Sequence, residues 1–418
     1  MPEFVLKYGQ TVQRLTVPAE SLVGVVAPRP VPAPAPGEVL VQEALARPVG
    51  GPPLAERVRP GQKVVILASD ITRPTPTATL LPPLLAELQR AGVARRDVTV
   101  VFGLGIHRRH TPAEQARLLG PAAGAVAALD SDPAQAVMLG RTSRGTPVAV
   151  FRPVAEADVR ICTGTVEYHY FAGYSGGVKA ILPGVCTRAT IEHNHALMVD
   201  PQAVAGEIDQ NPVRQDLEEV QRFAPADYLV NVVLNDQRQI VRAVAGDPHL
   251  AFRQAAAWVD ELNGCPLEGL ADVVIASAGG SPKDLNLYQA QKALDNARLA
   301  VRPGGVIILV AECPEGFGEP TFEEWMRSAG RPEDLITRLR QRFVLGGHKA
   351  AAIALTLQRA AVFLVSALPA ALVRQCFFEP YATVQQALAA ALERVGPGAS
   401  VLVMPQAGST LPRPARPT

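Results

Sequence analysis

Cysteine is scarce in this chain, and its few copies lie far apart. The 418 residues include five cysteines, none of which forms a C-x-x-C pair. An odd number of widely spaced cysteines argues against a disulfide framework and against a structural zinc site. We therefore expect the reducing environment of the cytoplasm, where thiols stay free.

Long apolar runs and an excess of charge of one sign are also missing. No stretch of 18 or more apolar residues occurs, and the first ten residues lack a basic segment followed by an apolar one. We expect neither a transmembrane helix nor a secretory signal. Lys and Arg number 40 against 39 Asp and Glu, a formal net charge of +1. With no global field of either sign, binding to nucleic acid or to an anionic membrane is not expected.

The sequence is rich in alternating strand and helix patterns. The short apolar runs Lys63–Ser69 and Asp97–Gly103 are typical of buried strands, and Thr79–Gly92 between them is typical of a helix. The same alternation resumes after Ala271. Strands that alternate with helices predict parallel sheets covered on both faces, so we expect an α/β fold with two α/β domains and mostly parallel sheets.

The expected domain boundary lies near residue 265. We assign residues 1–264 to an N-terminal α/β domain and 265–418 to a C-terminal one, with Cys265–Gly269 as a linker. The Pro- and Ala-rich stretch Ala27–Gly37 should be an extended connector, and the Pro-rich tail Leu411–Thr418 should be disordered. Ligand sites in such folds often lie between domains, so we expect the active site in the cleft between these two.

Four polar clusters follow expected strands. They are "SDITRPTP" from Ser69, "GLGIHRRHT" from Gly103, the stretch Glu167–His195, and "GGSPKDLNLYQAQK" from Gly279. Each cluster alone can be ordinary turn chemistry. Four clusters at corresponding positions favour one shared site, because the carboxyl ends of parallel strands meet at one edge of a sheet.

Lys179 follows a glycine-rich turn. Ser175, Gly176 and Gly177 precede it, and this segment can open a helix whose free amides would bind an anion such as phosphate. Glycines also let the backbone approach a ligand closely. A lysine in that position can be a phosphate counter-charge or a covalent attachment point, although an isolated lysine is more often a solvated surface residue.

The spacing between Lys179 and His195 requires a chain reversal. Sixteen residues would span ~24 Å along one straight helix, too far for one small cofactor. Pro183–Gly184 should end the first helix and reverse the chain. Thr187 can then begin a second helix, which would carry His195 back towards Lys179.

Histidines are candidates for metal binding and for proton transfer. His193 and His195 would lie about 200° apart on one helix, so at most one of them binds a given ion, and a structural role is favoured for His193. His107 and His169 come from separate loops. Either one alone is more often structural, but two together suit proton transfer on both faces of one carbon.

Positive side chains are candidates for a substrate carboxylate. Arg73 offers a planar fork that matches a carboxylate. Lys292 lies on an expected helix, where Tyr288 and Gln289 precede it by one turn and share its face. For Gln289 a solvated helix face remains an alternative.

At these residues the chain resembles the nickel-pincer lactate racemase family of 2-hydroxyacid racemases and epimerases. The matching motifs span residues 69 to 297, and the most specific of them is "HYFAGYSGGVKAILPGVCTRATIEHNH". The other motifs are "SDITRPTP", "GLGIHRRHT" and "GGSPKDLNLYQAQKALDNA". The general layout extends the resemblance over nearly the whole chain.

The resemblance implies a cofactor, a pyridinium-3-thioamide-5-thiocarboxylic acid mononucleotide that carries Ni(II) and is made by separate cofactor-synthesis enzymes. Lys179 matches the lysine that forms the thioamide, and His195 matches the histidine that completes square-planar nickel coordination. His107 and His169 match the acid/base pair. Arg73 and Lys292 match positive residues near the substrate, and Gln289 matches a neighbouring polar one. Asp70 and Thr72 lie in the loop of Arg73, where they either orient Arg73 or touch the cofactor. We also expect cofactor contacts from Ser175, Gly176, Gly177 and Tyr288.

The implied reaction is racemisation or epimerisation of a 2-hydroxy acid, with lactate as the default substrate. One histidine removes the hydroxyl proton while hydride leaves C2, and hydride then returns to the other face of the planar 2-keto acid. The second histidine serves the opposite enantiomer. The resemblance thus implies an isomerase that acts through reversible hydride transfer.

Three other classes of protein share parts of this pattern. A nicotinamide-dependent 2-hydroxyacid dehydrogenase needs G-x-G-x-x-G after a strand, and "GLGIHR" supplies two of the three glycines. A pyridoxal-phosphate racemase leaves His195 and the motifs of the second half unexplained. A non-catalytic binder or carrier of the nickel nucleotide has no use for the histidine pair.

Overall fold

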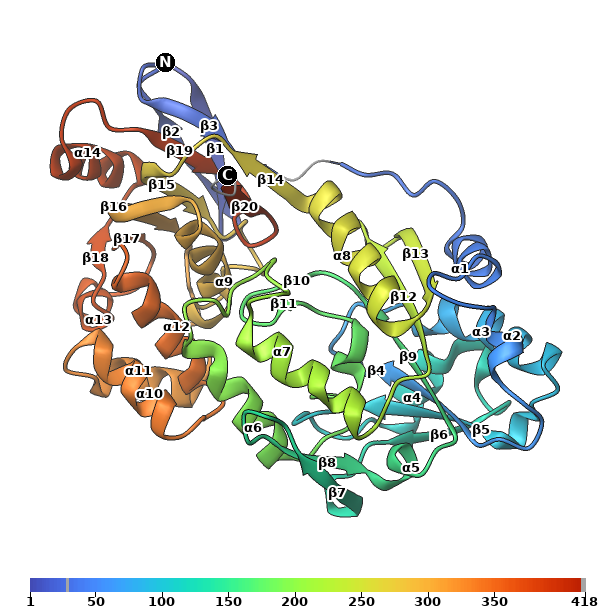
Figure 1. The fold of residues 1–418 in the computed structure, drawn as a ribbon. Coiled ribbons are helices and arrows are strands. Elements are labelled where there is room, and N and C mark those ends of the chain that lie inside the picture. Colours follow the sequence, from blue (N-terminus) through green and yellow to red (C-terminus); the bar gives the residue numbers. More distant parts are fainter. Residues whose placement is uncertain (28–29, 415–418) are drawn as a thin grey trace. The chain divides into compact units, whose positions relative to one another are not determined.

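The computed structural model describes residues 1–27 and 30–414 and forms two compact units (Figure 1). We call Pro30–Leu262 the central unit, and Met1–Arg29 with Asn263–Thr418 the terminal unit. The expected boundary at residues 264 and 265 lies beside the observed one, but the N-terminal segment differs from expectation. It belongs to the terminal unit, because β3 (Leu22–Val25) pairs in parallel with β19 (Val401–Met404).

The central unit contains a six-stranded sheet in the order β13-β12-β9-β4-β5-β6. Every neighbouring pair is parallel except β12 and β13. The inner strands β4 and β9 are buried along almost their whole length, as expected for a sheet covered on both faces. The strands of this sheet are β4 (Val64–Ser69), β5 (Val98–Gly103), β6 (Ala127–Asp130), β9 (Val159–Thr165), β12 (Tyr228–Leu234) and β13 (Ile240–Gly246).

Helices and short hairpins complete the central unit. The helix expected at Thr79–Gly92 is present as α3 (Thr77–Arg90), and its buried leucines share a core with β4 and β5. The other helices are α1 (Gly37–Ala46), α2 (Leu54–Arg57), α4 (Pro112–Leu119), α5 (Arg152–Ala155), α6 (Arg188–Ala196), α7 (Pro212–Glu218) and α8 (Pro248–Asn263), and the hairpin strands are β7 (Ala136–Arg141), β8 (Pro147–Phe151), β10 (Tyr168–His169) and β11 (Gly173–Tyr174).

The terminal unit has a second six-stranded sheet, in the order β18-β17-β16-β15-β19-β3. All of its neighbouring strands are parallel, so the expected class of two α/β domains with mostly parallel sheets is confirmed. Its remaining strands are β1 (Glu3–Tyr8), β2 (Thr11–Thr16), β15 (Ala271–Ser277), β16 (Val301–Val310), β17 (Ala361–Val365) and β18 (Glu379–Tyr381), and its helices are α9 (Leu287–Arg298), α10 (Pro320–Ser328), α11 (Pro332–Gln341), α12 (Gly347–Leu357), α13 (Ala370–Gln375) and α14 (Val384–Val395).

The proline-rich tail differs from expectation over its first four residues. The first residues of the expected linker form β14 (Gly264–Leu267), which pairs in parallel with β20 (Leu411–Pro414), so the expected disorder of the tail is wrong for residues 411–414. Each strand of a two-stranded pair has an open edge, where the missing N–H of a proline costs little. Residues 415–418 lie outside the described part, as do Pro28 and Arg29 of the expected connector, and Pro30–Pro36 contains neither helix nor strand.

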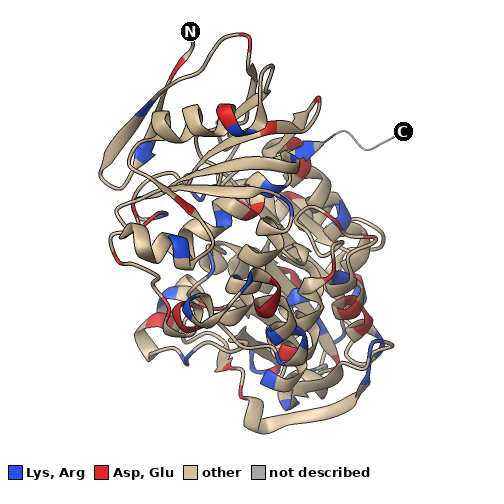
Figure 2. Ribbon diagram, turned by 90° about the vertical axis from the view of Figure 1, so that its left-hand side faces the viewer, with Lys and Arg blue, Asp and Glu red and all other residues tan. Residues whose placement is uncertain are grey.

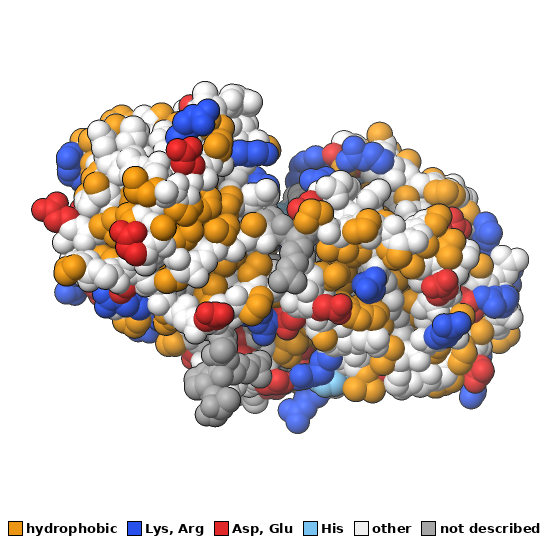
Figure 3. Space-filling model, turned by 90° about the horizontal axis from the view of Figure 1, so that it is seen from above, with side chains coloured by type: hydrophobic (Ala, Val, Ile, Leu, Met, Phe, Trp, Pro, Cys, Tyr) orange, Lys and Arg blue, Asp and Glu red, His pale blue; other side chains and the backbone are white. Residues whose placement is uncertain are grey.

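Charged residues are mixed in sign. Figure 2 shows basic and acidic residues interspersed over the ribbon, and neither sign gathers into a large patch on the face drawn in Figure 3. This distribution agrees with the near-zero net charge. In the described ranges, no helix combines the length and the apolar character needed to cross a membrane.

Candidate active site

The sheet of the central unit reverses its strand order between β4 and β9. β5 and β6 extend the sheet on one side of β4, and β9 and β12 extend it on the other. The loops at the carboxyl ends of β4, β5 and β9 carry Asp70–Arg73, His107 and Glu167–Lys179, respectively. In open α/β sheets this reversal point is where ligands bind.

Asp70 and His107 form a hydrogen-bonded pair across two of these loops. The distance from His107 Nδ1 to Asp70 Oδ2 is 2.6 Å, and Thr72 Oγ1 donates to Asp70 Oδ1 at 2.8 Å. Burial tends to raise the pKa of Asp70, but the bonds from His107 and Thr72 and the charge of Arg73 outweigh it and lower that pKa. An ionised Asp70 accepts the Nδ1 proton of His107, so the neutral ring carries its lone pair on Nε2.

His110, which the sequence analysis did not single out, fixes the loop of Asp70. Its Nε2 accepts from Ile71 N–H at 3.1 Å, and its Nδ1 lies 2.7 Å from Asp130 Oδ1. The ring is almost fully buried and packs edge-on against Phe102. The sequence does contain a signal for it, because the motif "GLGIHRRHT" has a second histidine three residues after His107.

Ser175 closes the hairpin that carries His169. Its Oγ donates to Thr165 O at 2.8 Å and accepts from Glu167 N–H at 3.0 Å. The backbone N–H of Ser175 also donates to Glu167 O at 2.8 Å. The hydroxyl expected near the cofactor is therefore engaged within the protein.

Gly176 and Gly177 pack against the protein's own interior. Both have positive φ, and a Cβ would lie 2.6 Å from Val166 Cγ2 at the first and 2.9 Å from Phe252 at the second. Gly177 N–H donates to the buried Asn231 Oδ1 at 2.8 Å. The glycines thus let the turn pack closely against Val166 and Phe252, and their contact with a ligand stays a prediction.

The chain reverses between Lys179 and His195, as expected. The segment with Lys179 is a single 3-10 turn, Gly177–Ala180, in place of the expected first helix. Thr187 caps α6, its side chain accepting from Thr190 N–H, and α6 carries His195 near its end. The expected second helix is therefore confirmed.

The ring of Phe171 brings Lys179, His169 and His195 together. Lys179 Nζ lies 6.0 Å from its centroid, and the rings of His169 and His195 lie 4.6 and 4.9 Å from it, both edge-on. Phe171 is only 4% exposed. The sequence analysis missed Phe171, because an apolar residue between functional ones carries no signal of its own.

The electrostatics of Lys179 and His169 are strongly perturbed. Burial lowers the pKa of Lys179 well below its usual value, and the charges of Arg214 and Arg73 lower it further. Burial also lowers the pKa of His169, followed by the charge of Lys179. Both side chains are therefore shifted towards their uncharged forms. Perturbations of this kind are concentrated at functional sites.

His195 is held in one tautomer by its neighbour. Its Nδ1 lies 3.1 Å from Oδ1 of Asn194, a fully buried side chain whose Nδ2 donates to Asp216 and to Val213 O. Because the carboxamide oxygen can only accept, Nδ1 of His195 donates, and Nε2 carries the lone pair that a metal requires.

His193 lies in a separate polar network. Its Nδ1 is 2.9 Å from Thr146 Oγ1, which in turn donates to Asp216 Oδ2 at 2.7 Å. This network supports the structural role that the sequence analysis favoured for His193.

The terminal unit contains the other predicted residues on α9, directly after β15. Asn286 caps this helix by accepting from Gln289 N–H at 3.1 Å. The ring of Tyr288 lies 4.1 Å from Nζ of Lys349, which also donates to Tyr288 O at 2.6 Å. Burial lowers the pKa of Lys349 to about 7, and the nearby charge of Lys292 acts in the same direction.

Metal-binding side chains do not cluster in the part of the chain that the structure describes. There, no group of three or more His, Cys, Asp or Glu residues could hold an ion.

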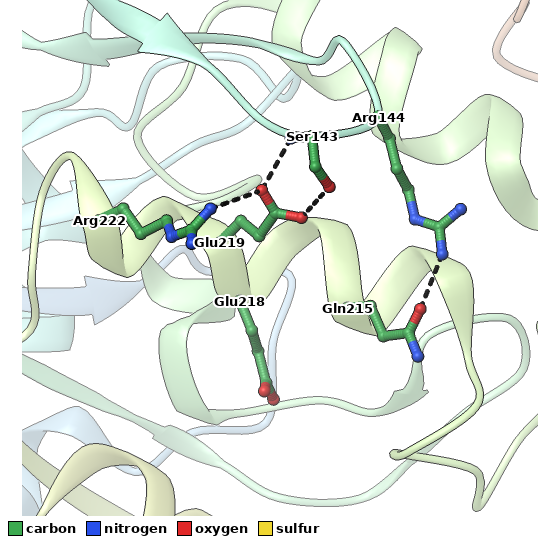
Figure 4. Close-up of a pocket in the computed structure, with 6 residues that line it drawn as sticks. All are labelled: Ser143, Arg144, Gln215, Glu218, Glu219 and Arg222. Carbon is green, nitrogen blue, oxygen red and sulfur yellow. Dashed lines mark hydrogen bonds and ion pairs between the residues drawn. The ribbon is translucent and has the colours of Figure 1, made fainter.

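A surface hollow of the central unit contains none of these residues (Figure 4). Glu219 accepts there from Ser143 N–H at 2.7 Å, and Arg144 donates to Gln215 at 2.7 Å. Internal pairing of this kind leaves the hollow without the features of a ligand site. Its lining residues are Ser143, Arg144, Gln215, Glu218, Glu219 and Arg222.

The protein is therefore a two-unit α/β protein with mostly parallel sheets. Its candidate site lies in the central unit, where a lysine and two histidines surround the buried ring of Phe171. Residues 8–206 match the lactate racemase N-terminal domain, and residues 268–411 match the lactate racemase C-terminal domain. The chain belongs to the lactate racemase family.

Relatives from two bacteria match most of the chain. A lactate racemase from Thermoanaerobacterium thermosaccharolyticum is 32% identical over 73% of this chain and 72% of that protein. One from Lactiplantibacillus plantarum is 30% identical over 87% of this chain and 88% of that protein.

Solved structures extend the similarity to the fold. The lactate racemase apoprotein of Thermoanaerobacterium thermosaccharolyticum matches with a TM-score of 0.88 and 28% identity, covering 99% of this chain and 100% of that one. A Thermotoga maritima protein matches with a TM-score of 0.61 at 17% identity, covering 90% of this chain and 98% of that one, and shows the fold alone.

Proposed function

We propose that this protein is a racemase of a 2-hydroxy acid, with lactate as the first substrate to test, and that it uses a lysine-tethered nickel-pincer nucleotide. The observation that carries the proposal is the convergence of Lys179, His169 and His195 on the ring of Phe171. Membership of the lactate racemase family supports the reaction class.

The side chains fit the proposed cofactor. A thioamide forms from an uncharged amine, and the environment of Lys179 favours that form. Nε2 of His195 carries the lone pair that a nickel ligand needs. When bound, this group would supply the acceptor for a hydride from C2 of the substrate.

His107 is the proposed base for one enantiomer. Its Nδ1 proton is held by Asp70, so Nε2 is left to take the hydroxyl proton of the substrate. A carboxylate behind a histidine fixes the ring orientation and stabilises the imidazolium that forms. His107 therefore needs no change of tautomer to begin the reaction.

His169 is the proposed partner for the opposite enantiomer. Ala172 N–H donates to its Nδ1 at 3.3 Å, so the neutral ring carries its proton on Nε2. His107 thus presents a lone pair that can take the hydroxyl proton, and neutral His169 presents an N–H that can donate a hydrogen bond to the keto oxygen. To protonate that oxygen, His169 would first have to bind a second proton at Nδ1. In the reverse direction the roles exchange, and the long bond from Ala172 is weak enough to be replaced.

Arg73, Lys292 and Gln289 are the proposed substrate-binding residues. Arg73 is exposed, and its charge acts on both Lys179 and His169. Its guanidinium can bind a carboxylate in a bidentate manner, whereas Lys292 would act as a point charge. Each of these two side chains offers a positive charge suited to a substrate with a carboxylate beside the reacting carbon.

The decisive experiment follows deuterium. The chain is coexpressed with cofactor-synthesis enzymes, and single C2-deuterated enantiomers of lactate and of larger 2-hydroxy acids are offered to it. Chiral chromatography should show the opposite enantiomer, with the deuterium largely retained at C2. Complete exchange with solvent would instead mean proton abstraction. A loaded chain that racemises no acid in the panel would be a cofactor carrier.

A further inference from the structure

Side chains at the start of helix α7 donate hydrogen bonds to three backbone carbonyls of the segment between His169 and Lys179. Asn211, the residue that caps α7, donates from Nδ2 to Phe171 O at 2.9 Å. Arg214, two residues into the helix, donates from Nε to Ala172 O at 3.2 Å and from Nη2 to Tyr174 O. These bonds fix the backbone at Phe171 and next to it, and thereby the position of its ring.

The guanidinium of Arg214 also packs beneath the turn that carries Lys179. It lies 4.5 Å from the ring centroid of Phe252. The same ring lies against Gly177, where a Cβ would approach it to 2.9 Å. Arg214, Phe252 and Gly177 therefore form one stacked support under the 3-10 turn of Lys179.

The charge of Arg214 is poorly compensated. The side chain is completely buried, and Nη1 makes no hydrogen bond within the described residues. Nη1 lies 3.9 Å from Oε1 of Glu218, which is 27% exposed. Burial lowers the pKa of Arg214 to about 10, so the group stays charged at neutral pH. A buried charge with one distant counter-ion is costly and requires a reason.

We propose that Arg214 is a positioning residue for Lys179, holding the Phe171–Tyr174 segment in place and setting a permanent positive charge behind the amine. Like charges at short range disfavour protonation, so the amine stays in its nucleophilic form. Arg73, from the loop after β4, adds to this effect, and His169 and His195 face the same ring. The inference rests on the proposed attachment role of Lys179.

The test measures the amine itself, in apoprotein without cofactor. Trinitrobenzenesulfonate modification of Lys179 is followed by peptide mass spectrometry from pH 6 to 11, with the exposed Lys283 as internal reference. In the unaltered chain, the pH at which the modification rate of Lys179 is half-maximal should lie well below the corresponding pH for Lys283. We call this pH the midpoint. Arg214→Gln should raise the midpoint, and a shift of one pH unit lowers the rate at pH 7 about tenfold.

A second variant should lower the midpoint of Lys179 while it keeps the hydrogen bonds from Arg214 to the Phe171–Tyr174 segment. Glu218→Gln removes the counter-charge of Arg214, so the midpoint of Lys179 should fall. Glu219→Gln is the matched control, because Glu219 is the next residue and pairs with Ser143 and Arg222 instead (Figure 4). It should leave the midpoint unchanged.

The outcomes separate this inference from the proposed function. Equal rate changes at every pH, with fixed midpoints in Arg214→Gln and Glu218→Gln, would mean that Arg214 is only structural. If Arg214→Gln does not fold, an unmoved midpoint in Glu218→Gln alone overturns the inference. An adduct that never forms on Lys179 in loaded protein would refute the attachment role, while opposite midpoint shifts in the two variants would still support the effect of Arg214.

Discussion

At the scale of single residues, protons in this site are placed by hydrogen-bond partners. Asp70 holds the Nδ1 proton of His107, Asn194 accepts the Nδ1 proton of His195, and the amide of Ala172 donates to Nδ1 of His169. His107 and His195 thereby present a lone pair at Nε2, whereas His169 presents an N–H. Changing a partner should therefore alter chemistry without removing the ring that performs it.

Asp70→Asn tests this for His107. An amide in place of the carboxylate no longer stabilises the imidazolium, so turnover of loaded enzyme should fall by ~10²–10⁴-fold in both directions while the fold is kept. The measurement is the initial racemisation rate from each enantiomer. Thr72→Val is the comparison, because it removes the hydroxyl that contacts Asp70 and His107 but keeps the carboxylate, and it should lower turnover less than Asp70→Asn. Retention of more than about a tenth of the activity in Asp70→Asn would exclude this role.

Lys179→Ala and His195→Ala should separate attachment from metal binding. The first should abolish the covalent adduct, and the second should keep the adduct but lose nickel. Intact mass and nickel content of loaded protein measure both. His193→Ala is the matched control and should retain nickel, since His193 is bound to Thr146. Full nickel occupancy in His195→Ala would transfer the ligand role to another residue.

At the scale of elements, helix α12 carries a buried histidine, His348, whose protonation is unfavourable in the folded state. Gly346 N–H donates to Nδ1 of the buried His348, and burial, followed by the charge of Lys349, lowers its pKa to about 3. The unfolded chain therefore binds this proton below pH 6.5 while the native chain does not. The free energy of unfolding must decrease as the pH falls from about 6.5 towards 3.

Urea unfolding at pH 7.5 and pH 5 tests this sign. In the unaltered chain the free energy of unfolding should fall between pH 7.5 and pH 5. In His348→Gln this fall should be smaller by about 2 kcal/mol, the free energy that the unfolded chain gains at pH 5 by protonating a histidine of pKa 6.5. Glutamine can still accept from Gly346 N–H. The exposed His249, changed to Gln, is the control and should leave the pH dependence unaltered. An unchanged dependence in His348→Gln would show that His348 protonates in the native state.

At the scale of the whole molecule, the N-terminal segment completes a core built from residues far along the chain. Leu6, Leu15 and Val17 are buried together with strands β15, β16 and β19. The terminal unit thus needs both ends of the chain.

Leu15→Ala should therefore weaken the terminal unit alone. Truncation of a buried leucine costs ~2–5 kcal/mol. Hydrogen exchange followed by mass spectrometry should accelerate in residues 271–277 and 401–404 and stay unchanged in residues 64–69. Leu84→Ala, in the core of the central unit, should give the opposite pattern. Equal acceleration of both units in either variant would mean that they unfold together.

The sequence by itself determined the α/β class, the family and the second helix of the lysine–histidine segment. These features depend on local patterns: apolar runs of strand length, the cap at Thr187, and a long motif from His169 to His195. Periodicity and capping act within a few residues, so a single sequence contains them.

Only the tertiary structure decided what surrounds the predicted side chains. The shared ring of Phe171, the buried charge of Arg214 and the pairing of β3 with β19 join residues that are distant in sequence. The close packing of Gly177 against Phe252 likewise joins residues that are distant in sequence. Burial and long-range pairing are set by the packing of the whole chain, and no local pattern records them.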